Sequence, residues 1–179
     1  MNQSISEEKM NQNHDGVEVF SYHKHSGYIG FTCAMIGVIV LESVGVSFLL
    51  YNWSPLLHWL HLALCIVIGV FLVMGLRAVI NNPITVKNNE LSFKIGLRPR
   101  VTIDTSAIKE LKSGNINYEN DRKNKELLDL SLLGFDAPTF ELVLHNSIIY
   151  KDLIGKERPI SRIFFSVDDK QTFYNMITK

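Results

Sequence analysis

Two long apolar segments, separated by four residues, constrain this chain more than any other feature. The first, residues 27–51, has 25 residues and a single charged side chain, Glu42. The second, residues 56–76, has 21 residues and no Asp, Glu, Lys or Arg. A bilayer core about 30 Å thick is crossed by about 20 helical residues, and neither segment has the polar face of a soluble amphipathic helix. We therefore predict two transmembrane helices. A signal peptide is a poor alternative for the first, because the segment is too long and no cleavage site follows.

The connection between the two segments predicts their arrangement. Asn52-Trp53-Ser54-Pro55 is so short that the helices must form an antiparallel hairpin, and Pro55 suits the first turn of the second helix. This connection has no Lys or Arg, whereas both outer flanks do. The positive-inside rule then predicts a multi-pass protein of the cell membrane with both termini in the cytoplasm.

The rest of the chain divides into a tail and a domain. Residues 1–26 are rich in polar residues at their start, and we predict a disordered cytoplasmic tail before the 27–80 transmembrane hairpin. From residue 83 to 179, short stretches alternate between apolar and polar residues, which predicts mostly antiparallel strands in a cytoplasmic domain. A helix with apolar spacing of three and four follows Asp168. The predicted fold is α+β, a small antiparallel barrel or bent sheet closed by the C-terminal helix. The strands are expected near residues 84–86, 91–95, 101–103, 128–132, 140–144, 148–153 and 158–165, and Ile108 and Leu111 suggest one further short element.

Two stretches carry a resemblance to known proteins. ITVKNNELSFKIGLRPRVTI, from residue 84, and RIFFSVDDKQTFYNMI, from residue 162, resemble a bacterial pleckstrin-homology-like domain. The whole chain resembles a family of uncharacterised bacterial two-span membrane proteins, in which Ser47 here replaces a frequent histidine. This resemblance implies an architecture and no particular activity. The matching pieces are Leu41-Glu42-Ser43, Trp53-Ser54-Pro55, Arg77-Ala78, Asn82-Pro83-Ile84 and Gly96-Leu97-Arg98.

Composition and motifs exclude several classes of function. The 18 basic and 18 acidic residues give a net charge of zero, so nothing indicates a nucleic-acid partner. No phosphate-binding loop, dinucleotide fingerprint, HExxH or nucleophile-elbow motif occurs, and we predict neither an enzyme nor a cofactor. His23 and His25 are better interpreted as solvated juxtamembrane residues than as metal ligands, so no metal site is expected.

Glu42 is the residue most worth explaining in the spans. In an antiparallel hairpin it lies near the level of Cys65, so His61, and one turn further His58, could join it in an intramembrane polar cluster. One interpretation is a proton- or metal-responsive cluster. The other is a neutral Glu42 that hydrogen-bonds the neighbouring helix and locks the hairpin. We favour the second.

Lys94, Arg98 and Arg100 form a basic group just after the membrane segment. The pleckstrin-homology resemblance implies possible contact with anionic lipid headgroups, and positive-inside bias is the competing explanation. The predicted function is a membrane-anchored binding or regulatory module without catalytic activity. Its partners would be the lipid bilayer, anionic headgroups, an unknown protein or further copies of the chain. The alternative is a small membrane sensor or transport accessory that uses Glu42 and His61.

Overall fold

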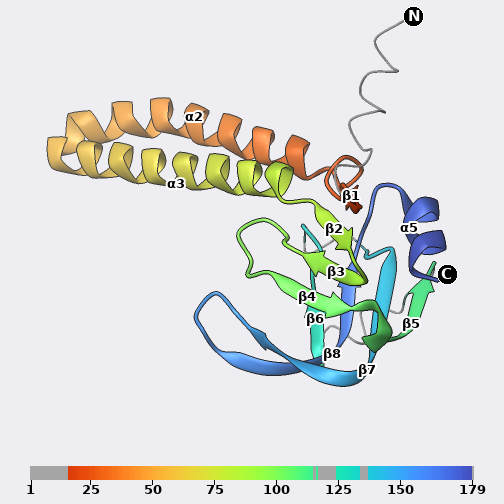
Figure 1. Ribbon diagram of the computed structural model, residues 1–179. Helices are drawn as coiled ribbons and strands as arrows, with labels where there is room; N and C mark the ends of the chain where they lie inside the picture. Colours follow the sequence, from red (N-terminus) through yellow and green to blue (C-terminus); the bar gives the residue numbers. More distant parts are fainter. Residues whose placement is uncertain (1–15, 115, 117–123, 134–136, 179) are drawn as a thin grey trace, which may run out of the picture.

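The two apolar segments form one long helical hairpin, α2 (Tyr28–Trp53) and α3 (Pro55–Asn81) (Figure 1). The computed structural model describes residues 16–114, 116, 124–133 and 137–178. Ser54 alone separates the helices, in an extended conformation, and Pro55 opens α3 where a missing N–H costs nothing. At 26 and 27 residues, each helix is about 40 Å long. The predicted hairpin is confirmed.

The surroundings of these helices exclude a role as core helices of a soluble protein. Only Thr32 and Ser47 of α2 and only Val79 of α3 are buried. The hairpin projects from the rest of the molecule (Figure 1). Large apolar side chains are exposed along both helices. Both helices are long and apolar enough to cross a bilayer, which indicates a membrane protein.

The first sheet is a four-stranded antiparallel meander that α3 enters directly. Its order is β1 (Val17–Phe20), β2 (Ile84–Lys87), β3 (Glu90–Phe93) and β4 (Val101–Asp104). Asn88 and Asn89 make the β2–β3 turn with positive φ angles, which asparagine tolerates better than most residues.

Strand β1 corrects one prediction. It lies within residues 1–26, which the sequence predicts as a disordered tail, yet Val17–Phe20 pairs antiparallel with β2 from Val17–Lys87 to Phe20–Ile84. The hydrophobic reason is Phe20, which is 5% exposed and packs edge-on against Phe173. The first fifteen residues of the predicted tail lie outside the described residues.

The second sheet has the order β5-β7-β8-β6 and a mixed direction. Its strands are β5 (Ile108–Ser113), β6 (Leu127–Asp129), β7 (Phe140–Lys151) and β8 (Glu157–Phe165). β6 pairs parallel to β8, which the expectation of antiparallel strands missed. The separately predicted strands 140–144 and 148–153 belong to the single long β7. Within the described residues the two sheets do not close into one barrel.

Aromatic rings from both sheets and from helix α5 (Lys170–Ile177) form the core. Phe93, Phe140 and Phe165 are all 1% exposed or less, and their rings meet that of Phe173 or one another within 5.6 Å. Asp169 caps α5 by accepting a hydrogen bond from the Thr172 N–H at 3.1 Å. The predicted C-terminal helix is therefore confirmed.

The helical hairpin is joined to this core by short connections. Only Asn82 and Pro83 separate α3 from β2, and Val79 at the end of α3 is 2% exposed within the core cluster. The Asn82 side-chain amide donates to the carbonyl of Ala78 at 2.7 Å, which closes the last turn of α3. The direction of the helices relative to the sheets is thus set by packing rather than by a linker.

Candidate functional site

The structure separates the three predicted intramembrane residues. Glu42 is exposed on α2 and, among the described residues, has no hydrogen bond or ion pair. A ring nitrogen of His58 lies 3.1 Å from the carbonyl oxygen of Ser47 and so links the two helices near their turn. His61 instead contacts Cys65 on its own helix, with Nε2 3.6 Å from the thiol sulfur.

These contacts change the interpretation of Glu42. The predicted hydrogen bond from Glu42 to the neighbouring helix is absent from the described part of the chain, so it is His58 with Ser47 that makes the polar contact between the helices. The described residues also contain no group of three or more His, Cys, Asp or Glu placed to hold a metal ion.

The three basic residues after the hairpin also differ from one another in their hydrogen bonds. Arg98 is half-buried and donates from Nη1 to the Asp129 carbonyl at 2.7 Å and from Nη2 to the Ser131 carbonyl at 3.2 Å. Its guanidinium therefore holds the β3–β4 connection against the segment after β6. Lys94 and Arg100 have no hydrogen bond or ion pair to any described side chain. They remain able to bind an anion.

The β3–β4 connection is a rigid turn. The Arg98 N–H donates to the Ile95 carbonyl at 3.1 Å, and Gly96 has a φ of +58°. A Cβ at Gly96 would lie 3.4 Å from a methyl group of Val79, so the turn sits directly against the end of α3. Leu97, at the turn's outer edge, is 43% exposed. The turn presents one apolar side chain between two free cationic ones.

A cavity of about 200 Å³ lies beside this contact and is lined by residues of the turn and of both helices. One wall is apolar and comes from α3, with Phe71, Gly75 and Val79, and the other holds the Arg98 side chain. Tyr28 of α2 also lines it, with its phenol oxygen 3.5 Å from where a Cβ of Gly75 would lie. Most of the described lining residues are apolar, and Arg98 is the one charged residue among them.

A second cavity, of about 180 Å³, lies behind Ser131 and Leu132. Asp168 accepts hydrogen bonds there from the N–H groups of Lys24 at 3.2 Å and His25 at 3.1 Å. These bonds fix the chain that leads into α2. Burial lowers the pKa of nearby His23, against an opposing effect of the Asp168 charge. The lining mixes polar and apolar residues, and the Thr139 hydroxyl buried there has no hydrogen-bond partner in the described structure.

Comparison of the chain with protein-family models, with curated proteins and with solved structures finds no match.

Sequence reasoning did not find the groove between α3 and the β3–β4 connection. Its walls come from residues 28 to 132 in the chain, and no local spacing connects them. Gly96 next to Val79 was the one available signal, because a glycine in a turn beside a membrane helix permits close approach.

Proposed function

We propose that this protein is a membrane-anchored binding module whose sheet domain is held at the bilayer surface and contacts anionic lipid headgroups through Lys94 and Arg100. The observation that carries the proposal is that both side chains are unpaired among the described residues and flank a turn packed on the membrane hairpin. Figure 1 shows this β3–β4 connection projecting toward the side on which the helices extend.

The length of α3 supports a position of this turn near the headgroups. Residues 56–76 are followed by Arg77, the first charged residue of α3, and 21 helical residues span about 32 Å, close to the hydrocarbon thickness. Arg77 therefore marks the domain-side edge of the hydrocarbon. Residues 78–83 then cross the headgroup layer, and the sheets begin immediately beyond. A cationic side chain at such a surface contributes about 1 kcal/mol of attraction to anionic lipid.

The proposal includes the type of domain, the family and the orientation in the membrane. Two small sheets with a C-terminal helix support a pleckstrin-homology-like domain, here of an open kind, and membership of the bacterial two-span family that the sequence resembles. The absence of Lys and Arg between the spans supports a cytoplasmic position for both termini in the cell membrane. No enzyme activity is proposed.

Native mass spectrometry of the full chain released from detergent micelles tests the headgroup contact. We expect wild-type protein to retain phosphatidylglycerol in preference to phosphatidylcholine, and the double variant Lys94→Gln/Arg100→Gln to lose that preference. The matched control is Lys109→Gln/Lys112→Gln, which removes the same charge from β5, on the side of the domain away from the helices (Figure 1). Equal retention of the two lipids by the wild type would overturn the proposal and leave a protein partner as the occupant of this surface.

The sensor or transport accessory built on Glu42 and His61 is the weaker proposal. No partner of Glu42 lies among the described residues, and His61 contacts Cys65. A proton path needs polar groups in contact with one another, and these two helices do not supply them within one copy.

A further inference from the structure

The outer half of the β7–β8 hairpin is an arm set apart from the rest of the second sheet. Pairing runs regularly to Val143–Arg162, is interrupted, and resumes at Ile148–Ile160. Four residues of β7 therefore lie opposite a single residue of β8. Beyond this irregularity the arm continues to Lys151–Glu157 and projects from the domain (Figure 1).

The inner face of the arm is buried in the core of the domain. Ile160 is fully buried and Tyr150 is 6% exposed. Burial raises the pKa of the Tyr150 phenol, and the positive charge of Arg98 partly opposes that effect. The charge of Arg98 in the β3–β4 connection therefore acts on the buried face of the arm.

The turn at the end of the arm is tightly built. The Gly155 N–H donates to the Asp152 carbonyl at 3.0 Å, and Gly155 adopts a φ of +84°. The Asp152 carboxylate accepts from the N–H groups of Ile154 at 3.0 Å and Lys156 at 2.8 Å. This is a hairpin turn with a glycine bulge, and it fixes Leu153 and Ile154 at its outermost positions.

Those two side chains are unusual occupants of a turn. Exposed turns favour Gly, Asn, Asp, Ser and Pro, yet Leu153 is 68% and Ile154 is 93% exposed. Ile149, on the outer face of the arm, adds a third large apolar side chain that is 67% exposed. Isolated exposed apolar residues need no explanation, but two at the tip of a projecting hairpin, with a third on its outer face, form an apolar wedge.

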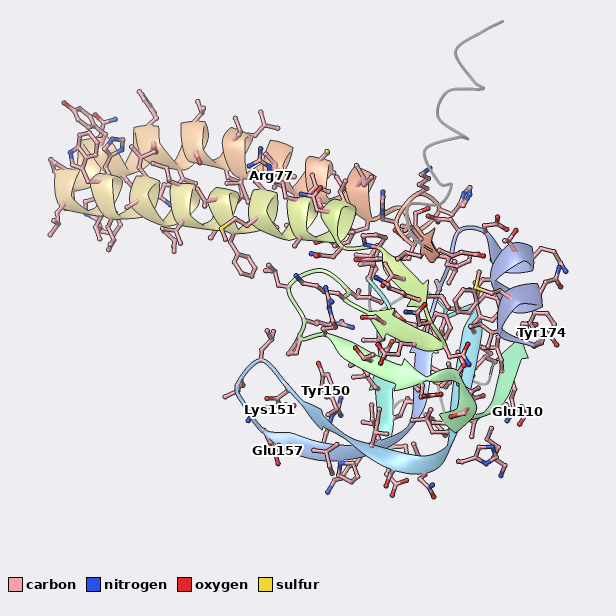
Figure 2. The ribbon with its side chains drawn as sticks, in the orientation of Figure 1. Arg77, Glu110, Tyr150, Lys151, Glu157 and Tyr174 are labelled. Atoms are coloured by element: carbon pink, nitrogen blue, oxygen red, sulfur yellow. The ribbon has the colours of Figure 1, made fainter. Side chains whose placement is uncertain are left out.

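The position of the tip identifies what the wedge meets. In Figure 2 the helices run across the view, and Arg77 lies at about the same level along them as Lys151 and Glu157 at the end of the arm. Arg77 marks the edge of the hydrocarbon, because it is the first charged residue of α3. A plane through Arg77 and perpendicular to the helices, which is the expected plane of the membrane surface, therefore passes by the tip.

The charges around the tip suit such a surface. Lys151 pairs with Glu157 at 3.5 Å, and the Arg158 guanidinium stacks over the Tyr150 ring at 5.6 Å from its centroid. The Lys156 ammonium has no partner among the described residues, and the Asp152 carboxylate is occupied within the turn. An apolar tip with a cationic collar is the pattern of segments that rest in the interface of an anionic bilayer.

We propose that the Leu153–Ile154 tip inserts into the interfacial layer of the same bilayer that α2 and α3 cross, as a third membrane contact of the chain. The proposal extends the proposed function, since it rests on the same placement of the domain against the membrane. The tip contacts lipid in this proposal. Two observations favour lipid: the tip lies at the level of Arg77, and cationic side chains surround it. A second copy of the chain is the competing occupant.

An environment-sensitive fluorophore tests the insertion directly. The full chain, with Cys33 and Cys65 replaced by Ala, carries the label NBD on Ile154→Cys and is reconstituted into nanodiscs of phosphatidylcholine and phosphatidylglycerol. We expect a blue-shifted emission and loss of fluorescence when a nitroxide quencher is placed on the lipid chains. The matched control is the label on Lys109→Cys, an exposed position beside Glu110 at the opposite side of the domain (Figure 2). It should be neither shifted nor quenched.

Two outcomes overturn the proposal. In the first, the Ile154→Cys probe is as accessible to water as the Lys109→Cys probe. In the second, the probe is shifted but insensitive to the lipid quencher, and unlabelled Ile154→Cys protein forms disulfide-linked dimers upon oxidation, which would assign the tip to a second copy. Failure of the headgroup proposal is distinguishable, because it appears as equal lipid retention by wild type and Lys94→Gln/Arg100→Gln while quenching at Ile154→Cys persists.

Discussion

The phenol oxygen of Tyr22 accepts a hydrogen bond from the backbone N–H of Gly96 at 3.1 Å. Tyr22 precedes the first membrane helix, and Gly96 forms the turn that follows the second, so this bond joins the two ends of the helical hairpin on the domain side. Both residues are buried, and burial raises the pKa of the Tyr22 phenol above its ordinary value.

Replacement of Tyr22 by Phe should therefore destabilise the domain. The ring still fills its space, but the Gly96 N–H is left buried without a partner, which costs about 1–3 kcal/mol. Chemical unfolding of the full chain in micelles measures the loss. Tyr174→Phe is the control, because Tyr174 on α5 is 37% exposed. Equal stability of the two variants would mean that the Gly96 N–H finds another acceptor.

Replacement of Arg98 by Lys should weaken the fold and leave lipid binding intact. An ammonium group cannot donate to the Asp129 and Ser131 carbonyls with the geometry of a guanidinium. Since Arg98 is partly exposed, we expect a loss of about 1 kcal/mol. Native mass spectrometry should show the retention of phosphatidylglycerol unchanged. A folded Arg98→Lys protein that lost this lipid would show that Arg98 itself is a headgroup ligand.

How far the sequence predicts such a structure depends on the range of each interaction. The spans were predictable, because a bilayer requires about 20 consecutive apolar residues whatever they pack against. Strands such as residues 91–95 and 140–144 were predictable as well, since one buried face imposes alternation. Strand β1 was not, because four residues after a polar segment become a strand only once β2 supplies a partner. Alternation in residues 128–132 likewise indicated a strand, which the structure has at Leu127–Asp129, but not its parallel direction.

The candidate site shows the same limit more sharply. The sequence gives no reason to distinguish Lys94, Arg98 and Arg100 from one another. In the structure Arg98 differs from the other two because it donates to the carbonyls of Asp129 and Ser131, which lie 31 and 33 residues further along the chain. In the sequence, Leu153 and Ile154 look like the apolar end of a strand. That they form an exposed tip follows only from the turn made by Asp152 and Gly155. That the tip faces the membrane follows only from the direction of the helices.

The buried pair between Glu141 on β7 and Arg162 on β8 gives a third prediction. Glu141 is 4% exposed and accepts from both Nε and Nη2 of Arg162, with Lys112 a further 3.9 Å contact. Glu141→Gln should lower the free energy of unfolding by about 3 kcal/mol, the lower end for breaking a buried ion pair. We expect the lower end because the Arg162 side chain is 23% exposed.

The matched control for that variant is Glu157→Gln on the neighbouring arm. Glu157 pairs with Lys151, and both side chains are more than 60% exposed. Exposed pairs contribute about 0–1 kcal/mol, so this change should be nearly neutral in the same unfolding experiment. Comparable losses from the two variants would contradict the assignment of Glu141 as the buried partner.

Glu42 gives the last prediction. It lies ten residues before Asn52 at the turn, so its carboxyl is about 15 Å into the hydrocarbon. Glu42 is exposed and has no partner within the described chain. Glu42→Leu should therefore leave the unfolding free energy of the monomer in micelles within about 0.5 kcal/mol of wild type. Ser47→Leu is the contrasting variant, because Ser47 is buried where its carbonyl meets His58, and it should be clearly destabilising. A loss of more than about 1 kcal/mol for Glu42→Leu that grows with protein concentration would contradict the prediction. Glu42 would then be hydrogen-bonded to a second copy of the chain, as polar groups are between membrane helices.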